Sequence, residues 1–177
     1  MEYLQIMKAK FDIQFLIRRK ELKKIRNIKQ YKKAAGLDGW ILITIGDYEY
    51  VFLQEDDTAD TIDGFELLDE WFDSFKDIYE KLNKASRVVL DYWDEPDEFF
   101  VFERKSNLVH VQYFEKAFPI IEGRIQQTRV YDIKLIAETI VPEELFFNTI
   151  KTKVNEFWTE VGNLNTNLQN YIEEFKI

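Results

Sequence analysis

Two acidic stretches hold the side chains whose types and spacing come closest to a chemical site. They cover residues 55–63 and 91–98. A calcium loop needs oxygen ligands at fixed positions and a glycine at its sharp turn. Asp63-Gly64 matches the fifth and sixth of these positions, but Ala59 would then occupy the first position, where an oxygen ligand is needed. No glycine-rich phosphate loop accompanies these acids. We therefore expect neither a metal ion nor another cofactor.

Nucleophilic catalysis would need residues that this chain lacks. Cysteine is absent, His110 is the only histidine, and no serine stands in a Gly-x-Ser-x-Gly turn, so the usual triads cannot be assembled. His110 stands between two valines of a strand-like segment, which is more typical of a structural histidine than of a catalytic one. Acid–base catalysis by two carboxylates stays open, but nothing selects two of the 33 acids. We expect a protein that is not an enzyme.

Charge is distributed unevenly along the chain. Residues 1–36 carry 11 Lys and Arg against 3 Asp and Glu, a balance of +8. The remaining 141 residues carry 13 against 30, a balance of −17. A surface dominated by one sign speeds association with the opposite charge and disfavours partners of like charge. The pattern indicates a binding protein whose partner is basic.

The basic end of the chain is predicted to form a strand and then a helix. Apolar residues alternate through residues 11–17, and residues 18–35 carry a narrow apolar stripe before Gly36 ends the helix. The helix could grip nucleic-acid phosphates, although Tyr31 is its only aromatic for stacking on bases. Alternatively it is simply solvated, or it docks on the protein's own acidic face, within one chain or across a dimer. Its basic residues are Arg18, Arg19, Lys20, Lys23, Lys24, Arg26, Lys29, Lys32 and Lys33.

An acidic amphipathic helix is predicted from Phe65 to Asn83, with Asp63 as its N-cap. At about 100° per residue its apolar side chains fall on one half of the helix, and its acids gather on the opposite face. Those acids are Glu66, Asp69, Glu70, Asp73, Asp77 and Glu80. Like charges four residues apart each destabilise a helix by about 0.3 kcal/mol. The all-acid face is therefore either a solvated face or a recognition face for a cationic surface.

Strands with short turns account for most of the remaining sequence. Their alternation and turn residues predict antiparallel strands over residues 40–45, 49–53, 87–93, 99–104, 108–114 and 129–141. Pro142 then opens a helix that runs to about residue 161, and a last short helix follows over residues 164–175. The predicted fold is α+β, with an antiparallel meander of about six strands and helices packed on it.

The length of the chain favours a single domain over residues 1–177. We divide it into a basic segment (1–36), the sheet with the acidic helix (37–141) and the C-terminal helices (142–177). The apolar content of 46% is enough for a sizeable core. There is no signal peptide pattern and no apolar run long enough to span a membrane, and the absence of cysteine fits a reducing compartment. We expect a cytoplasmic protein.

The order of these elements resembles that of small bacterial immunity proteins, which neutralise a cognate polymorphic or contact-dependent toxin. The resemblance rests on the hairpin at residues 40–48, the acidic helix and the meander through Phe114, and it covers about half of the chain. It is one of architecture, since no signature motif is present. It implies inhibition by occlusion, with acidic side chains facing a cationic toxin site, often that of a nuclease.

The leading hypothesis is thus a non-catalytic binding protein with a basic protein partner, such as a toxin or nuclease domain. Acids would steer that partner, and exposed aromatics would anchor it. The predicted contact residues are Glu66, Asp69, Glu70, Asp73, Asp77, Glu80, Tyr92, Trp93, Asp94, Glu95, Asp97 and Glu98. One alternative is a nucleic-acid-associated or regulatory protein that uses the basic helix. The other is a structural homo-oligomer, such as a homodimer, in which the basic segment of one subunit meets the acidic face of the next.

Overall fold

The computed structural model of the chain describes residues 9–31, 36–51, 66–91, 97–117, 120–121, 124–125 and 132–177. Within them the chain has an α+β fold, as predicted. The strands are β1 (Phe11–Ile17), β2 (Asp38–Ile45), β3 (Tyr48–Val51), β4 (Glu66–Leu67), β5 (Arg87–Asp91), β6 (Glu98–Lys105), β7 (Leu108–Ala117), β8 (Ile120–Ile121), β9 (Arg124–Ile125) and β10 (Asp132–Pro142). The helices are α1 (Arg19–Leu22), α2 (Ile28–Tyr31), α3 (Leu68–Leu82), α4 (Glu143–Leu164) and the 3-10 helix η1 (Ile172–Glu174).

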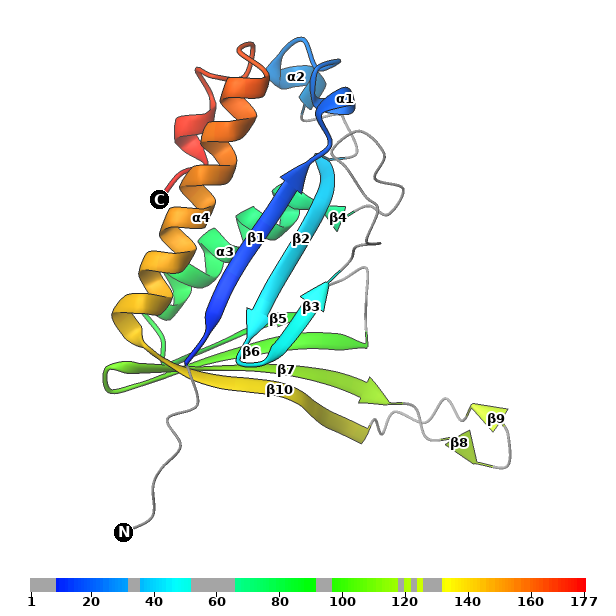
Figure 1. Cartoon of the computed structure of the whole chain (residues 1–177), viewed down its shortest axis with the longest axis vertical. Coiled ribbons are helices and arrows are strands. Elements are labelled where there is room, and N and C mark those ends of the chain that lie inside the picture. The colour runs from blue at the N-terminus through cyan, green and yellow to red at the C-terminus, as the bar shows by residue number, and fades with distance from the viewer. Residues whose placement is uncertain are drawn as a thin grey trace.

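The described strands form two larger antiparallel sheets instead of one. β1, β2 and β3 lie side by side in that order, with β4 also paired to β2. β10, β7, β6 and β5 form the second sheet in that order, and β8 pairs with β9. Figure 1 shows the second sheet across the base of the molecule, with β1, β2 and β3 rising from it. The prediction of one sheet of about six strands is not confirmed, because alternation along a strand defines its faces but not its neighbours.

The local strand predictions are confirmed more closely. Ile45 pairs with Tyr48, so the β2–β3 turn has two residues, and Gly46 has the positive φ of 61° that such turns require. β5, β6 and β7 follow one another through short connections, as the meander predicted. β10 then pairs with β7, and its register shifts between Leu135 and Ala137 at a β-bulge.

One hydrophobic core joins the two sheets to α3 and α4. The two helices pack together through stacked rings of Phe72 and Phe157, whose centroids are 4.1 Å apart. Phe15 of β1 contacts both rings edge to face. Tyr113 of β7 packs at 5.3 Å from Tyr50 of β3, which joins the second sheet to the first. Aromatic residues therefore hold the layers together, which agrees with their 16% share of the sequence.

The basic segment does not form the single helix predicted over residues 18–35. It forms the one-turn helices α1 and α2 with a turn between them, and residues 32–35 lie outside the described part. The Asn27 side chain accepts a hydrogen bond from the backbone N–H of Gln30 at 2.9 Å, so it caps α2 and starts a new helix. The apolar stripe still faces the core, since Leu22, Ile25 and Tyr31 are buried.

Two other helix boundaries differ from the prediction. α3 begins at Leu68 and not at Phe65, because Glu66 and Leu67 pair with β2 as a strand; Asp63 and Phe65 lie outside the described residues. α4 continues past residue 161 to Leu164, and turns with η1 replace the last predicted helix. Gly162 lies within α4, and Ile172 packs closely against it, with its Cδ1 only 2.5 Å from where a Cβ would stand.

Candidate protein-binding surfaces

Asp69, predicted on the partner-binding face of the acidic helix, is instead buried under the basic segment. It is 9% exposed. One carboxylate oxygen accepts a hydrogen bond from the Tyr31 hydroxyl at 2.8 Å, and the other accepts one from the Leu37 N–H at 2.8 Å. Burial and the neighbouring carboxylate raise the pKa of Tyr31, so its hydroxyl remains a donor. Both carboxylate oxygens of Asp69 are therefore occupied within its own chain, by partners that lie more than 30 residues away in the sequence.

The exposed face of α3 is not the all-acid stripe that was predicted. Asp73, Asp77 and Glu80 are exposed and Glu70 is half-buried, whereas Glu66 belongs to β4 and not to the helix. The Lys81 ammonium lies 2.6 Å from the Asp77 carboxylate, so both signs occur on this face. Loss of water around its carboxylate, and then repulsion from Asp69, raise the pKa of Asp73 to about 6, although much of the side chain is exposed.

A second acidic surface lies where the β2–β3 turn meets the ends of β6 and β7. Of the predicted contact residues here, Asp97 and Glu98 are described and half-buried, whereas Tyr92, Trp93, Asp94 and Glu95 lie outside the described residues. Tyr48 packs on Tyr113 with ring centroids 5.6 Å apart, which brings the turn against β7. We call this surface the acidic edge, and its members are Asp47, Glu49, Asp97, Glu98 and Glu115.

Two carboxylates of the acidic edge face each other without a paired cation in the described part of the chain. Glu98 and Glu115 lie directly opposite on β6 and β7, an arrangement that destabilises a sheet. Burial and these two carboxylates raise the pKa of Tyr48, and burial with a hydrogen bond to Glu98 raises that of Tyr113. The buried Oε2 of Glu98 accepts no hydrogen bond. Across the described chain, none of the five acids has a Lys or Arg within ion-pair distance.

Sequence reasoning missed three members of this edge. Asp47 and Glu49 were used only to recognise a hairpin, and Glu115 lies just beyond the end of a predicted strand. The stacked rings of Tyr48 and Tyr113 bring the β2–β3 turn, with Asp47 and Glu49, against β7. The register of β6 with β7 then places Glu115 opposite Glu98. The acid-rich sequence around the β2–β3 turn was a usable signal, but the pairing partner of β6 also had to be known.

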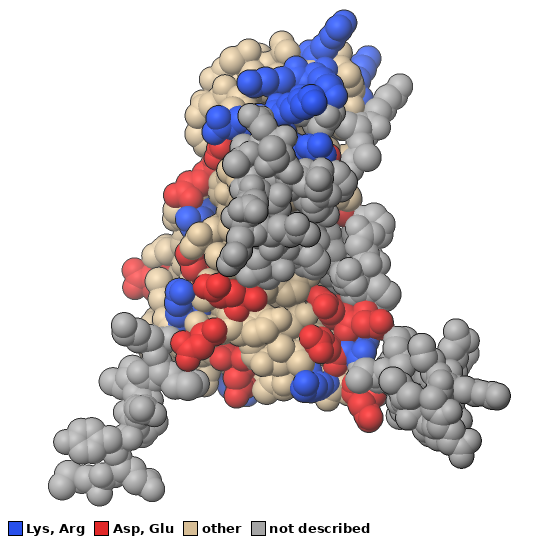
Figure 2. Space-filling view, turned by 45° about the vertical axis from the view of Figure 1, so that its right-hand side comes forward, with Lys and Arg blue, Asp and Glu red and all other residues tan. Residues whose placement is uncertain are grey.

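The basic residues form an exposed patch at the opposite end of the molecule, which we call the basic cap. Figure 2 shows Lys and Arg side chains at the top of the molecule and most visible acids in its lower half. The exposed members are Arg19, Lys20, Lys23, Lys24, Arg26 and Lys29. The Arg18 guanidinium lies 3.9 Å from the Asp38 carboxylate. Lys32 and Lys33 are outside the described residues. The Asn165 amide donates to the carbonyls of Leu22 and Ile25 at 2.7 Å each. The segment therefore docks within its own chain, with its charges in solvent.

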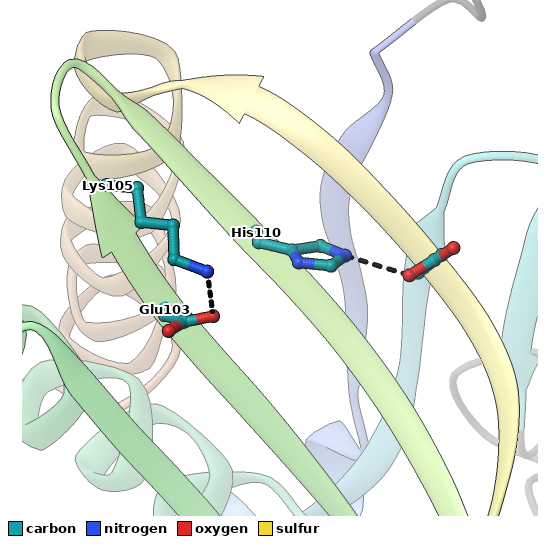
Figure 3. Close-up of polar contacts among 4 residues, drawn as sticks. Glu103, Lys105 and His110 are labelled. Atoms are coloured by element: carbon teal, nitrogen blue, oxygen red, sulfur yellow. Dashed lines mark hydrogen bonds and ion pairs between the residues drawn. The ribbon is translucent and has the colours of Figure 1, made fainter.

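The second sheet has one face packed on the core and one face open to solvent. On β7, Val109, Val111 and Tyr113 are buried, so His110 and the residues paired with it lie on the other side. This outer sheet face carries three close polar pairs: Glu103 with Lys105 at 3.0 Å, His110 with Glu138 at 2.9 Å and Asp91 with Lys116 at 3.1 Å. Figure 3 shows the first two pairs on the side of the strands turned away from α4 and β1. The hydrogen bond from Lys105 lowers the pKa of Glu103.

His110 and Glu138 form a hydrogen-bonded pair on this face, and Glu103 and Ile140 lie opposite His110 on the two neighbouring strands. Among the described residues, no group of three His, Asp or Glu side chains is placed to hold a metal ion. In the same part of the chain, no helix is both long and apolar enough to cross a membrane.

Comparison of the chain with known proteins gives no match to a family model, to a curated protein or to a solved structure. The function therefore has to be argued from the two charged ends and the open sheet face.

Proposed function

We propose that this chain is a non-catalytic binding protein of the immunity type, which inhibits a basic protein toxin, such as a nuclease, by covering its cationic site. The acidic edge carries this proposal. None of its five acids forms an ion pair in the described part of the chain, and Glu98 faces Glu115 directly. Such repulsion costs stability in the free protein. A cationic partner would offset that cost on binding.

Each part of the surface has a distinct role in this proposal. Glu98 and Glu115 would set the register of the partner, because strands hold their positions. The half-buried Tyr48 ring beside them supplies an aromatic contact. Exposed Asp73, Asp77 and Glu80 on α3 would add to the field that speeds encounter. Placement in the cytoplasm, which the absence of cysteine fits, belongs to the same proposal.

The test begins with capture of the partner on the tagged chain from the native host, with elution by rising salt. The association rate of the purified partner is then measured with wild type, with a Glu98→Lys/Glu115→Lys variant, and with a Glu173→Lys control. Glu173 is 73% exposed on η1 and lies outside the acidic edge. We expect the double reversal to slow association by about tenfold or more at low salt, and the control to change it little.

Two results would contradict the proposal. Equal association rates for the double reversal and the control would remove the acidic edge from the interface. A captured protein that does not harm growth when expressed alone would remove the immunity role, since an immunity protein must rescue cells from its partner on co-expression.

The basic cap favours a second candidate function, a nucleic-acid-associated or regulatory protein. Six exposed Lys and Arg side chains crowd the short segment from Arg19 to Lys29. Binding to single-stranded DNA should then fall steeply with salt, with a logarithmic slope of about −0.7 per phosphate contact. A Lys20→Glu/Lys23→Glu variant should flatten that slope. Affinity that does not change in this variant would exclude the cap as the site.

A further inference from the structure

The outer sheet face concentrates the exposed apolar surface of the molecule. Seven large apolar side chains are exposed in the described part of the chain, and five of them lie on this face. They are Val89, Leu108, Ile133, Leu135 and Ile140, with exposures from 40% to 62%. Scattered exposed apolar residues are ordinary, but a shared face of this kind marks an interaction surface.

The register of the sheet places the exposed apolar side chains of β10 on the same face as two aromatic rings of β6 and β7. Ile140 pairs with His110, Leu135 with Phe114, and Ile133 with Lys116, so all three β10 residues point the same way. Phe114 in turn stacks on Phe99 of β6, with ring centroids 5.0 Å apart. The apolar surface therefore runs from β10 across β7 to β6.

The charges of this face are already compensated within it. Glu103 and Asp91 each have a lysine partner at 3.0 and 3.1 Å, and Glu138 pairs with the His110 ring at 2.9 Å. Arg87, which lies opposite Glu103 on β5, is the third cation of the face and balances the third carboxylate. The Lys116 ammonium also lies over the Phe99 ring, 5.4 Å from its centre. A basic protein or a nucleic acid would find little net charge to bind here. The neighbouring acidic edge, by contrast, points to the inner side of the same strands.

From this we infer that the outer sheet face binds the same face of a second copy of this chain and forms a two-fold dimer. Two chains with a net charge of −9 repel each other, and this neutral apolar face lets them meet at the smallest electrostatic cost. In a two-fold interface the same surface of both subunits makes the contact, so a face without net charge meets another face without net charge. Packing of two twisted sheets, face to face and nearly aligned, is the corresponding geometry.

The size of the face is sufficient for this role. The four strands contain 34 residues. At about 3.4 Å by 4.8 Å per residue, they give a flat area of about 550 Å². Protruding side chains enlarge that area toward the roughly 800 Å² per partner that specific interfaces bury. The dimer leaves both acidic edges free, so it is independent of the proposed function.

The test is sedimentation velocity of the purified full chain from about 1 to 100 μM, at low and at high salt. We expect a species of twice 21.4 kDa that persists at high salt. Ile140→Lys and Ile133→Lys should each weaken the dimer by about 30-fold or more, because each change occurs twice in the interface. Tyr171→Lys is the matched control, since Tyr171 is also exposed, at 38%, but lies outside the face.

Both Ile→Lys variants should keep the far-ultraviolet spectrum and melting temperature of wild type, because their side chains are exposed. A chain that stays monomeric at every concentration would overturn the inference, as would a dimer that both variants leave intact. A dimer that dissociates at high salt would instead point to contact between the basic cap and an acidic surface. Binding of wild type, but not of Ile140→Lys, to phosphatidylcholine vesicles by a monomeric chain would assign the face to lipid and overturn the dimer.

Discussion

The basic cap and the acidic edge lie at different ends of the molecule and are held in opposite ways. In the cap, the charged side chains are exposed, while two buried polar side chains, Asp69 and Asn165, fix the segment beneath them. In the edge, regular strands fix the backbone, while Glu98 and Glu115 face each other without a cation. The segment that carries the cap thus contributes stability through the buried hydrogen bonds of Asp69 and Asn165. The edge reduces stability through its like-charged pair.

The two ends also differ in how their charges affect the free protein. A like-charged pair on adjacent strands is unfavourable in the free protein, and under the proposed function a bound cationic partner would offset that cost. The charges of the cap carry less of this cost, because they are exposed and spread over α1, α2 and the turn between them. Substitutions in the cap anchors should therefore lower stability, and those in the edge should raise it.

The largest expected effect is that of Asp69→Ala. The change leaves the Tyr31 hydroxyl and the Leu37 N–H buried without an acceptor. Each buried donor without a partner costs about 1–3 kcal/mol, so we expect the free energy of unfolding to fall by about 3 kcal/mol. Urea denaturation measures the change, and faster amide hydrogen exchange around α1 and α2 should accompany it.

Asp77→Ala is the matched control on the same helix. Asp77 is exposed, and its ion pair in the described part of the chain is with Lys81, so its removal should change the free energy of unfolding by less than about 0.5 kcal/mol. Equal effects of the two substitutions would show that Asp69 does not anchor the cap.

The contrast between Asp69 and Asp77 also shows how far the sequence predicts this molecule. Alternation and turn residues predicted β1, the β2–β3 hairpin, the β5–β6–β7 meander and the amphipathic character of α3. These features depend on neighbours in the sequence. The burial of Asp69 depends on Tyr31, 38 residues away, and helical periodicity alone places Asp69 with the other acids.

The two-sheet arrangement was beyond prediction for a similar reason. Period-two alternation shows which residues of β3 and β5 share a face, but not that these strands belong to different sheets. The acidic edge depends on that arrangement, since Tyr48 of one sheet packs on Tyr113 of the other. The Asn27 cap that divides the basic helix was a usable signal in the sequence, because asparagine is a favoured N-cap residue.

A smaller effect, and one that depends on pH, is expected for Asp73→Asn. Its pKa of about 6 in the folded protein lies above the usual 3.8 of an aspartate. The folded state therefore binds more protons than the unfolded state between these values, and wild type loses stability as the pH rises through that window. The asparagine variant lacks this loss. At pH 7 we expect it to be more stable than wild type by less than 1 kcal/mol, because solvent screens an exposed carboxylate.

Thermal unfolding of wild type and Asp73→Asn between pH 4 and pH 7 measures this effect. The difference in stability should vanish near pH 4, where both folded proteins carry a neutral side chain at residue 73. An advantage that is constant across this range would mean that the charge of Asp73 is not its cause.

The smallest expected effect is that of Glu98→Gln in the acidic edge. It removes one charge of the Glu98–Glu115 pair and keeps an oxygen that can accept from Tyr113. Relief of a like-charged cross-strand pair should raise the free energy of unfolding by about 0.3 kcal/mol at low salt, and by less at high salt. The same substitution should slow association with a basic partner, so stability and binding should change in opposite directions.

A double-mutant cycle with Glu115→Gln separates repulsion from other effects. Each single substitution already removes the one repulsion between the two carboxylates, so the double variant should gain less than the two single gains together. Chemical denaturation of the four proteins at low salt provides the cycle. Strictly additive gains would mean that Glu98 and Glu115 do not repel each other, and the comparison between the two charged ends would then lose its physical basis.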